Sequence, residues 1–289
     1  MSSLRVRSRL VPYFLVLPGW LWLVIFFVVP TLVMLSVSTM TGDLASGFKQ
    51  TFHWSTYSDG WSQYHTQFVR SIVYGLIATL ICFVIAYPVA YWIAFRGGAH
   101  KSSLLFLLLL PFFVSFVIRT QSWNFILSDN GMVLSHLKTW GVVGKDFHVL
   151  ATSSAVIGGL VYNFLPFMVL PIYVALERVD PALLEASADL YASKTAAFRK
   201  VVFPLSMPGV FAGVLLTFVP ATADYVNAAI LGGTKTTMIG NVIQTEYFTN
   251  LDYPKAAALS FILMAALLVG VFAYARTLGT DDVLDMAGA

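Results

Sequence analysis

Long, uninterrupted apolar runs recur along the whole chain. Six are long enough for a helix that crosses a bilayer, which needs about 20 apolar residues. They cover residues 13–35, 68–95, 104–127, 150–175, 209–231 and 256–278. The runs are continuous rather than alternating, and a backbone in lipid must satisfy its own hydrogen bonds. The pattern therefore predicts transmembrane helices and not a barrel.

The predicted fold class is an all-α polytopic membrane protein with six transmembrane helices. Composition agrees, because 58% of the residues are hydrophobic and only 11% are charged, whereas a soluble domain has about 25% charged residues. Soluble enzymes, disordered chains and nucleic-acid-binding proteins are excluded. We expect residues 1–67 to hold the N-terminal tail, the first span and the first periplasmic loop. Residues 68–278 would form a five-helix core containing an inner loop at 176–207, and 279–289 a cytoplasmic tail.

Basic residues are distributed unevenly between alternate connections. With a cytoplasmic N-terminus, the inner side carries Arg5, Arg7, Arg9, Arg96, Lys101, Arg178, Lys194, Arg199, Lys200 and Arg276. The outer loops carry only Lys49, Lys138, Lys145, Lys235 and Lys255. This bias predicts that both termini are cytoplasmic. The basic N-terminus could instead begin a signal peptide, but the apolar run is long and lacks a cleavage site, so we favour an uncleaved first span.

The inner loop at 176–207 is the longest inner connection and has amphipathic character. Asp180 followed by Pro181 is a typical helix start, with the aspartate as N-cap. Ser193 is a candidate cap for a second short helix, which we expect to end at Pro204. Such a long loop exceeds what joining two spans requires. It predicts a docking element, although a helix lying on the membrane surface is the alternative.

A few ionisable residues lie inside predicted spans, where charge is costly and often functional, and Arg70 in the outer half of the second span is one of them. Arg119 and Asp224 both fall in the outer halves of their spans. Arg119 could extend to the interface, and Asp224 could pair with it, pair with a helix terminus or line a path for a cation. The candidate pathway residues are Arg119, Trp123, Tyr162, Asn163, Asp224, Tyr225 and Asn227; the aromatic members could attract cations.

The outer segment at 232–254 begins with two glycines and continues with apolar residues at helical spacing. It predicts a short amphipathic helix that covers the outer mouth of the bundle. The candidate gate residues are Gly232, Gly233, Gly240 and Asn241.

No catalytic or metal-binding constellation is visible in the sequence. The histidines are dispersed over loops, and no Gly-rich phosphate loop is present, so we expect the chain not to hydrolyse ATP itself. Two rival classes remain. A secondary transporter or channel would need acidic or His residues near the midplane and symmetric broken helices. A membrane-embedded enzyme would need a catalytic cluster.

The stretch from Glu185 to Tyr191, followed by Val201-Val202-Phe203-Pro204, resembles the cytoplasmic signature of binding-protein-dependent ABC importer permeases. That signature reads Glu-Ala-Ala, three residues, Gly, nine residues, Ile-x-Leu-Pro. Ser187 replaces the second Ala, and Tyr191 replaces the Gly. If that Gly has a positive φ, a tyrosine there costs about 1–2 kcal/mol. We expect either that the helix runs on through Tyr191 or that the bend is made elsewhere.

This resemblance implies a type I permease fold whose coupling helices dock onto separate ATPase subunits. The coupling residues it implies are Glu185, Ala186, Ser187, Asp189, Tyr191, Ser193, Arg199 and Pro204. The runs at 110–120, 165–171 and 232–241 look like spermidine/putrescine-type permeases. The implied function is polyamine import, with another small solute such as iron, sulfate, phosphonate or a sugar as the alternative.

The resemblance also implies partners and a location. ATP and Mg²⁺ would be bound by two partner ATPase subunits and not by this chain. A second, related permease chain would complete a heterodimer, and a periplasmic or lipid-anchored protein would deliver the substrate. The implied location is the bacterial inner membrane.

Overall fold

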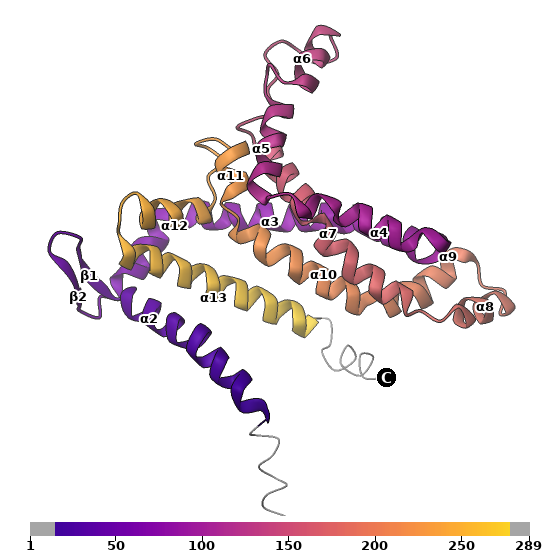
Figure 1. Ribbon diagram of the computed structural model, residues 1–289, viewed down its shortest axis with the longest axis horizontal. Helices are drawn as coiled ribbons and strands as arrows, with labels where there is room; N and C mark the ends of the chain where they lie inside the picture. Colours follow the sequence, from indigo (N-terminus) through magenta and orange to yellow (C-terminus); the bar gives the residue numbers. More distant parts are fainter. Residues whose placement is uncertain (1–14, 278–289) are drawn as a thin grey trace, which may run out of the picture. The chain divides into compact units, whose positions relative to one another are not determined.

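The computed structural model describes residues 15–277 and consists almost entirely of helices (Figure 1). Five helices in this part are long and apolar enough to cross a membrane, and a bent helix pair supplies a possible sixth span. The prediction of an all-α polytopic membrane protein is therefore confirmed. The chain divides into two compact units: Met1–Gln63 with Ile243–Met264, and Tyr64–Val242 with Ala265–Ala289.

The smaller unit begins, in its described part, with the apolar helix Leu15–Val37. This helix has a π-helical turn at Val24–Val28 and continues as α2 (Val29–Val37). A short antiparallel hairpin follows, formed by β1 (Met40–Asp43) and β2 (Gly47–Gln50). The predicted first outer loop therefore contains regular structure.

The helices that follow the hairpin build the larger unit, and the ends of three of them reach into the smaller one. In chain order they are α3 (Ser55–Arg96), α4 (Lys101–Leu109), α5 (Phe116–Leu127), α6 (Met132–Thr139), α7 (Ser153–Glu177), α8 (Pro181–Asp189), α9 (Lys194–Ala197), α10 (Phe203–Ala223), α11 (Val226–Leu231), α12 (Ile239–Phe248) and α13 (Tyr253–Thr277).

The third and fifth predicted spans are not single straight helices. The run 104–127 is bent by 89° between Phe113 and Phe116, because Pro111 removes a backbone donor and the chain then becomes extended at Val114. The run 209–231 breaks at Asp224, which is extended and caps the next turn with its own side chain. The predicted end of the last span at Leu278 lies outside the described residues.

Small residues let α7 and α10 approach each other closely. A Cβ added at Gly209 would lie 2.4 Å from the Pro171 carbonyl oxygen, and one at Gly213 would lie 2.8 Å from the Met168 sulfur. Two glycines four residues apart are a common way for helices to associate in a membrane. This contact places the fully buried Met168 in the main core, with residues of α3 around it.

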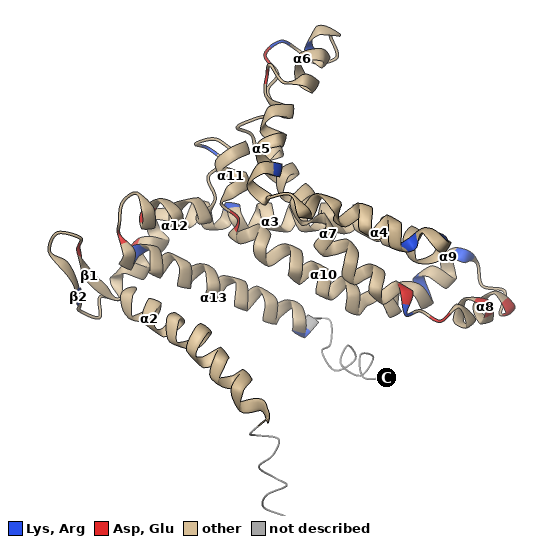
Figure 2. Cartoon of the chain, viewed as in Figure 1, with Lys and Arg blue, Asp and Glu red and all other residues tan. Residues whose placement is uncertain are grey.

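Most charged residues lie in the connections and near helix ends, Arg70 inside α3 being an exception, and long stretches of α2, α7, α10 and α13 carry none (Figure 2). In α7 the only charged residue is Glu177, at its last position. This distribution is expected for helices that cross a bilayer, because unpaired charge is costly in the bilayer core.

Candidate functional site: the coupling loop and a buried polar cluster

Both helices at the tip of the coupling loop, residues 176–207, begin at side-chain caps. Asp180 Oδ1 accepts a hydrogen bond from Ala182 N at 2.9 Å at the start of α8. Ser193 Oγ accepts one from Ala196 N at 3.2 Å at the start of α9. Caps of this kind are worth about 1 kcal/mol each. The two caps predicted from the sequence are confirmed.

The turn between α8 and α9 is a Schellman motif closed at Tyr191. Tyr191 N donates to Ala188 O at 2.9 Å, and Ala192 N donates to Ser187 O at 3.0 Å. Tyr191 has a φ of +57°, a left-handed conformation that costs an L-residue with a side chain about 1–2 kcal/mol. Both expectations from the sequence are wrong, because α8 ends before Tyr191 and the bend lies at this residue itself.

The second helix of the loop does not end at Pro204. It continues without a break from Lys194 to Ala223. A π-helical turn at Phe198–Val202 stands directly before Pro204, which lies in the first turn of α10. A proline lacks the N–H that an α-helix interior needs, and a π turn changes the hydrogen-bonding register just ahead of it. The turn at Val24–Val28 precedes Pro30 in the same way.

One face of α8 is exposed and acidic. Glu185 and Asp189 stand one turn apart and are both exposed, as is Ala186 between them. Neither carboxylate forms an ion pair with any residue in the described part of the chain. Like charges four residues apart weaken an isolated helix. The face is therefore suited to a basic partner surface.

The other side of the loop is fixed to the core of the larger unit. Leu184 and Phe198 pack against the buried cluster. The Phe198 ring lies 5.7 Å from the Tyr87 ring of α3 in an edge-on arrangement. The Tyr87 hydroxyl is also hydrogen-bonded to Ser206 Oγ of α10 at 2.8 Å. The loop is thus linked to α3 and α10 through aromatic and hydrogen-bonded contacts.

A polar cluster is buried where α5, α7 and α11 meet. We define it as Thr120, Asn163 and Asn227, each at most 1% exposed. Asn163 Nδ2 donates to Thr120 Oγ1 at 3.1 Å and to Asn227 Oδ1 at 3.0 Å. Asn163 Oδ1 and Asn227 Nδ2 have no partner among the described residues. The cluster therefore keeps one acceptor and one donor whose loss of water is uncompensated within the chain.

Arg119 and Asp224 lie beside the polar cluster in sequence, but they do not pair. The Arg119 guanidinium lies over the Phe112 ring at 4.6 Å from its centroid, and the side chain is buried rather than extended to an interface. Asp224 Oδ1 accepts a hydrogen bond from Asn227 N at 2.8 Å. Within residues 15–277 no carboxylate lies within 4.0 Å of Arg119. The charge of Asp224 is thus not neutralised by this arginine.

The predicted pathway aromatics separate into a pair and a single residue. The rings of Trp123 and Tyr162 lie 5.3 Å apart in an edge-on arrangement that links α5 to α7. Tyr225 follows Asp224 in the break between α10 and α11 and is 44% exposed. It is therefore the predicted pathway aromatic whose ring is open to solvent in this structure.

The outer segment contacts the break at Asp224 directly. Asn241 Nδ2 donates to the Tyr225 carbonyl oxygen at 2.7 Å, and Asn241 Oδ1 accepts from Met238 N at 3.2 Å. A Cβ at Gly240 would lie 2.7 Å from the Ala223 carbonyl oxygen. Asn241 therefore binds the carbonyl that follows Asp224, and Gly240 allows the segment to approach the carbonyl that precedes it. The predicted helix in this segment is confirmed as α12.

The glycine pair at the start of the outer segment forms a tight turn. Gly233 N donates to Thr236 Oγ1 at 2.7 Å. A Cβ at Gly232 would lie 2.4 Å from the Ala228 carbonyl oxygen, so the chain needs glycine to leave α11 at this angle. On the other side, Arg70 of α3 donates to the Thr237 carbonyl oxygen at 2.8 Å. The segment is thus attached to both α11 and α3.

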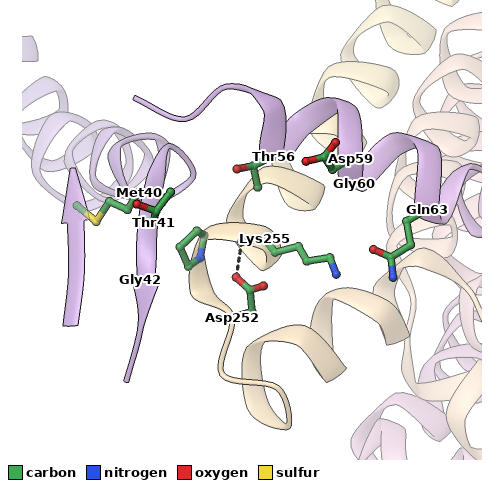
Figure 3. A pocket seen from close by; sticks show the side chains of 10 residues that line it. Met40, Thr41, Gly42, Thr56, Asp59, Gly60, Gln63, Asp252 and Lys255 are labelled. Atoms are coloured by element: carbon green, nitrogen blue, oxygen red, sulfur yellow. Dashed lines mark hydrogen bonds between the residues drawn. The ribbon is translucent and has the colours of Figure 1, made fainter. Parts of the chain in front are cut away.

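The smaller unit holds a polar pocket of its own, with a volume of about 330 Å³ (Figure 3). Asp59, Gln63 and Asp252 line it. Asp252 Oδ1 accepts a hydrogen bond from Lys255 N at 3.1 Å at the start of α13, so its role there is that of a helix cap. In the neighbouring hairpin, hydrogen bonds from the Ser46 backbone and side chain lower the pKa of Asp43.

No protein-family model matches the chain, whereas comparison with individual proteins is decisive. The chain is 38% identical over 256 residues to the spermidine/putrescine transport system permease protein PotB of Escherichia coli. The match covers 88% of this chain and 93% of that protein. The chain belongs to the spermidine/putrescine-type ABC importer permeases. It is a permease subunit and not an enzyme.

Solved ABC importers share the fold of this permease. A bacterial transporter that imports the acidic polysaccharide alginate matches with a TM-score of 0.72 at 16% identity, covering 97% of this chain and 99% of that one. The same kind of transporter in complex with an alginate-bound periplasmic protein matches with a TM-score of 0.68 at 16% identity, covering 96% of each chain. These likenesses confirm the type I permease fold predicted from the sequence.

Thr120 and Arg70 of the permease have structural roles that the sequence did not predict. Thr120 completes the buried cluster, and its only signal was a hydroxyl residue directly after Arg119 inside an apolar run. From the sequence Arg70 is only a charge in the outer half of a span, but in the structure it donates to the Thr237 carbonyl oxygen and so attaches the outer segment to α3. Both roles depend on contacts between segments far apart in the sequence.

Proposed function

We propose that this permease imports spermidine or putrescine and forms half of the translocation pathway. The support comes from the 38% identity to a spermidine/putrescine permease along nearly the full length of both chains. Asp224 adds a physical argument, because its carboxylate is buried and is not paired with Arg119. An unneutralised carboxylate in the outer half of a bundle attracts cations.

The coupling loop supports a mechanism of alternating access. Two partner ATPase subunits would bind ATP and Mg²⁺ and press on the exposed face around Glu185. The contacts of Phe198 and Tyr87 would transmit this motion to α3 and α10. The bundle would open outward to accept the substrate, and hydrolysis would return it to the inward-open state.

Because this chain would form only half of the translocation pathway, further partners are needed. A second, related permease chain would supply the facing half as a heterodimer, together with further acidic groups for a polycation. A periplasmic or lipid-anchored protein would deliver the substrate to the outer segment near Asn241. We place the complex in the bacterial inner membrane with both termini of this chain in the cytoplasm, in line with the distribution of basic residues.

The test is ATP hydrolysis by the complex reconstituted with its own binding protein and a panel of ligands. The panel contains spermidine, putrescine, ferric iron, sulfate, a sugar and an amino acid. Stimulation by the polyamines alone is the expected result. Stimulation by another ligand would overturn the substrate proposal, and failure of any ATPase to co-purify would overturn the coupling proposal.

A further inference from the structure

Asn163 and Asn227 are predicted pathway residues that are too deeply buried to line a pathway in this structure. Asn163 is 1% exposed and Asn227 is 0% exposed, whereas Tyr225, two residues before Asn227, is 44% exposed. A side chain without accessible surface cannot touch a solute. Any contribution of the two asparagines to transport must therefore act through another residue.

Asn227 connects the buried polar cluster to Asp224. Its side-chain Oδ1 accepts a hydrogen bond from Asn163 Nδ2 at 3.0 Å, and its backbone N donates to Asp224 Oδ1 at 2.8 Å. Asp224 has an extended backbone at the end of α10 and is itself buried. One residue of α11 thus fixes the carboxylate, and a residue of α7 fixes that residue in turn.

α11 needs to be held by its neighbours, because it is only six residues long. A helix of this length is unstable on its own. α7 approaches it closely at Gly159, where an added Cβ would lie 2.6 Å from Asn227 Oδ1. At the other end of α11, the Ile230 carbonyl oxygen accepts a hydrogen bond from Asn124 Nδ2 of α5 at 2.7 Å. The start of α11 is therefore fixed through Asn227, separately from its end.

The two buried amides are a poor choice for stability alone. Asn163 Oδ1 and Asn227 Nδ2 have no hydrogen-bond partner within residues 15–277. A buried amide with one unsatisfied atom carries a desolvation penalty that apolar side chains of similar shape would avoid. Direction is what the amides supply and apolar residues do not, because a hydrogen bond restricts the orientation of Asn227 relative to α7.

We propose that Asn163 is a positioning residue for the substrate: through Asn227 it holds the Asp224 carboxylate where an ammonium group of an organic cation meets it. This inference rests on the proposed function, in which Asp224 attracts the cation, and deepens it. Asp224 uses Oδ1 for the cap, and its second oxygen is not needed there. Coulomb attraction falls with distance and a hydrogen bond to an ammonium group requires alignment, so a displaced carboxylate binds the cation less well.

A double-mutant cycle of transport separates positioning from stability. The complex is reconstituted in proteoliposomes with its binding protein, and the uptake of spermidine and putrescine is expressed per folded complex. Asn163→Leu removes both hydrogen bonds that Asn163 donates. We expect it to lower uptake about fivefold or more alone, but less than about twofold further in combination with Asp224→Asn. If Asn163 acted only on the fold, the two losses would multiply.

Asn124→Leu is the matched control, because it removes an amide hydrogen bond to the same helix at Ile230 instead of at Asn227. Any loss that it causes should multiply with the loss in Asp224→Asn. Thr120→Val is the second variant in case Asn163→Leu does not fold. It deletes the hydroxyl that is bonded to both asparagines with little change in shape. We expect a smaller loss that again disappears in combination with Asp224→Asn.

Two results would overturn the positioning role while polyamine import stands. One is wild-type uptake in both Asn163→Leu and Thr120→Val, and the other is a pair of losses that multiply in the double variant. A wild-type complex that imports neither polyamine would instead overturn the proposed function. That failure is read from the wild type alone, so the two are distinguishable.

Discussion

The coupling loop and the buried polar cluster use polar residues in opposite ways. In the loop, Glu185 and Asp189 are exposed and unpaired within the described chain, so their interactions are available to a partner. In the cluster, Asn163 and Asn227 are buried and bonded to each other, with one donor and one acceptor left over. An exposed charge loses little when it has no partner, whereas a buried amide loses its hydration. Substitutions on the exposed face of the loop should therefore cost the fold little stability, whereas substitutions in the cluster should destabilise it.

The contact between α7 and α10 supports both regions, and its loss should have the largest effect. Gly209→Leu would drive a side chain into the Pro171 carbonyl, where even a Cβ would lie at 2.4 Å. Because overpacking at a backbone contact cannot be relieved by rotamer changes, we expect a destabilisation of about 3 kcal/mol or more. The measurement is the yield of folded complex in detergent and its unfolding temperature.

Gly158→Leu is the control for this substitution, because a Cβ there meets nothing within 4 Å in the structure. Gly158 lies in α7, the helix that packs against α10, and the substitution adds the same apolar side chain. Normal yield of the Gly209 variant would show that α7 and α10 can separate, and the account of the shared core would be wrong.

Asp224→Asn tests whether the region beside the cluster carries substrate. Asparagine keeps the oxygen that accepts from Asn227 N, so the break between α10 and α11 should persist while the charge is lost. We expect polyamine uptake to fall about tenfold or more, because the negative charge that attracts the cation is lost. A tenfold change corresponds to roughly 1.4 kcal/mol. Uptake into proteoliposomes is measured beside the yield of assembled complex.

Asp252→Asn makes the same chemical change at a capping aspartate of the smaller unit and should transport normally. Wild-type uptake in Asp224→Asn would remove this carboxylate from the pathway. A loss of assembly would instead show that its role is structural.

Glu185→Lys tests the exposed region. The substitution reverses the charge on a face that makes no ion pair within the described chain, so the permease itself should fold normally. We expect ligand-stimulated ATP hydrolysis to fall severalfold through repulsion from a basic partner surface, an effect that weakens at higher salt. Asp146→Lys, at an exposed aspartate in the connection between α6 and α7, is the control. Normal stimulation in Glu185→Lys at low salt would count against the coupling role.

The two regions also differ in how far the sequence predicted them. The caps at Asp180 and Ser193 and the spacing of the loop signature are local, so they could be identified residue by residue. The positive φ of Tyr191 was not expected, since propensity favours either a continuing helix or glycine there. The cluster depends on tertiary packing, because Thr120 meets Asn163 and Asn227 only after three helices converge. The bend near Phe113 and the helix that continues through Pro204 likewise depend on backbone geometry that proline alone does not specify.

The smallest effect we expect comes from removing a cap in the loop. Asp180→Ala deletes the acceptor for Ala182 N at the start of α8 and should destabilise that helix by about 1 kcal/mol. Because α8 lies at an exposed tip, the loss should appear as faster amide exchange in α8 without a lower yield of complex. Asp180→Asn keeps an acceptor oxygen and should restore protection. If Asp180→Ala instead reduced the yield as strongly as Gly209→Leu, the loop would be part of the folding core, and its contrast with the polar cluster would disappear.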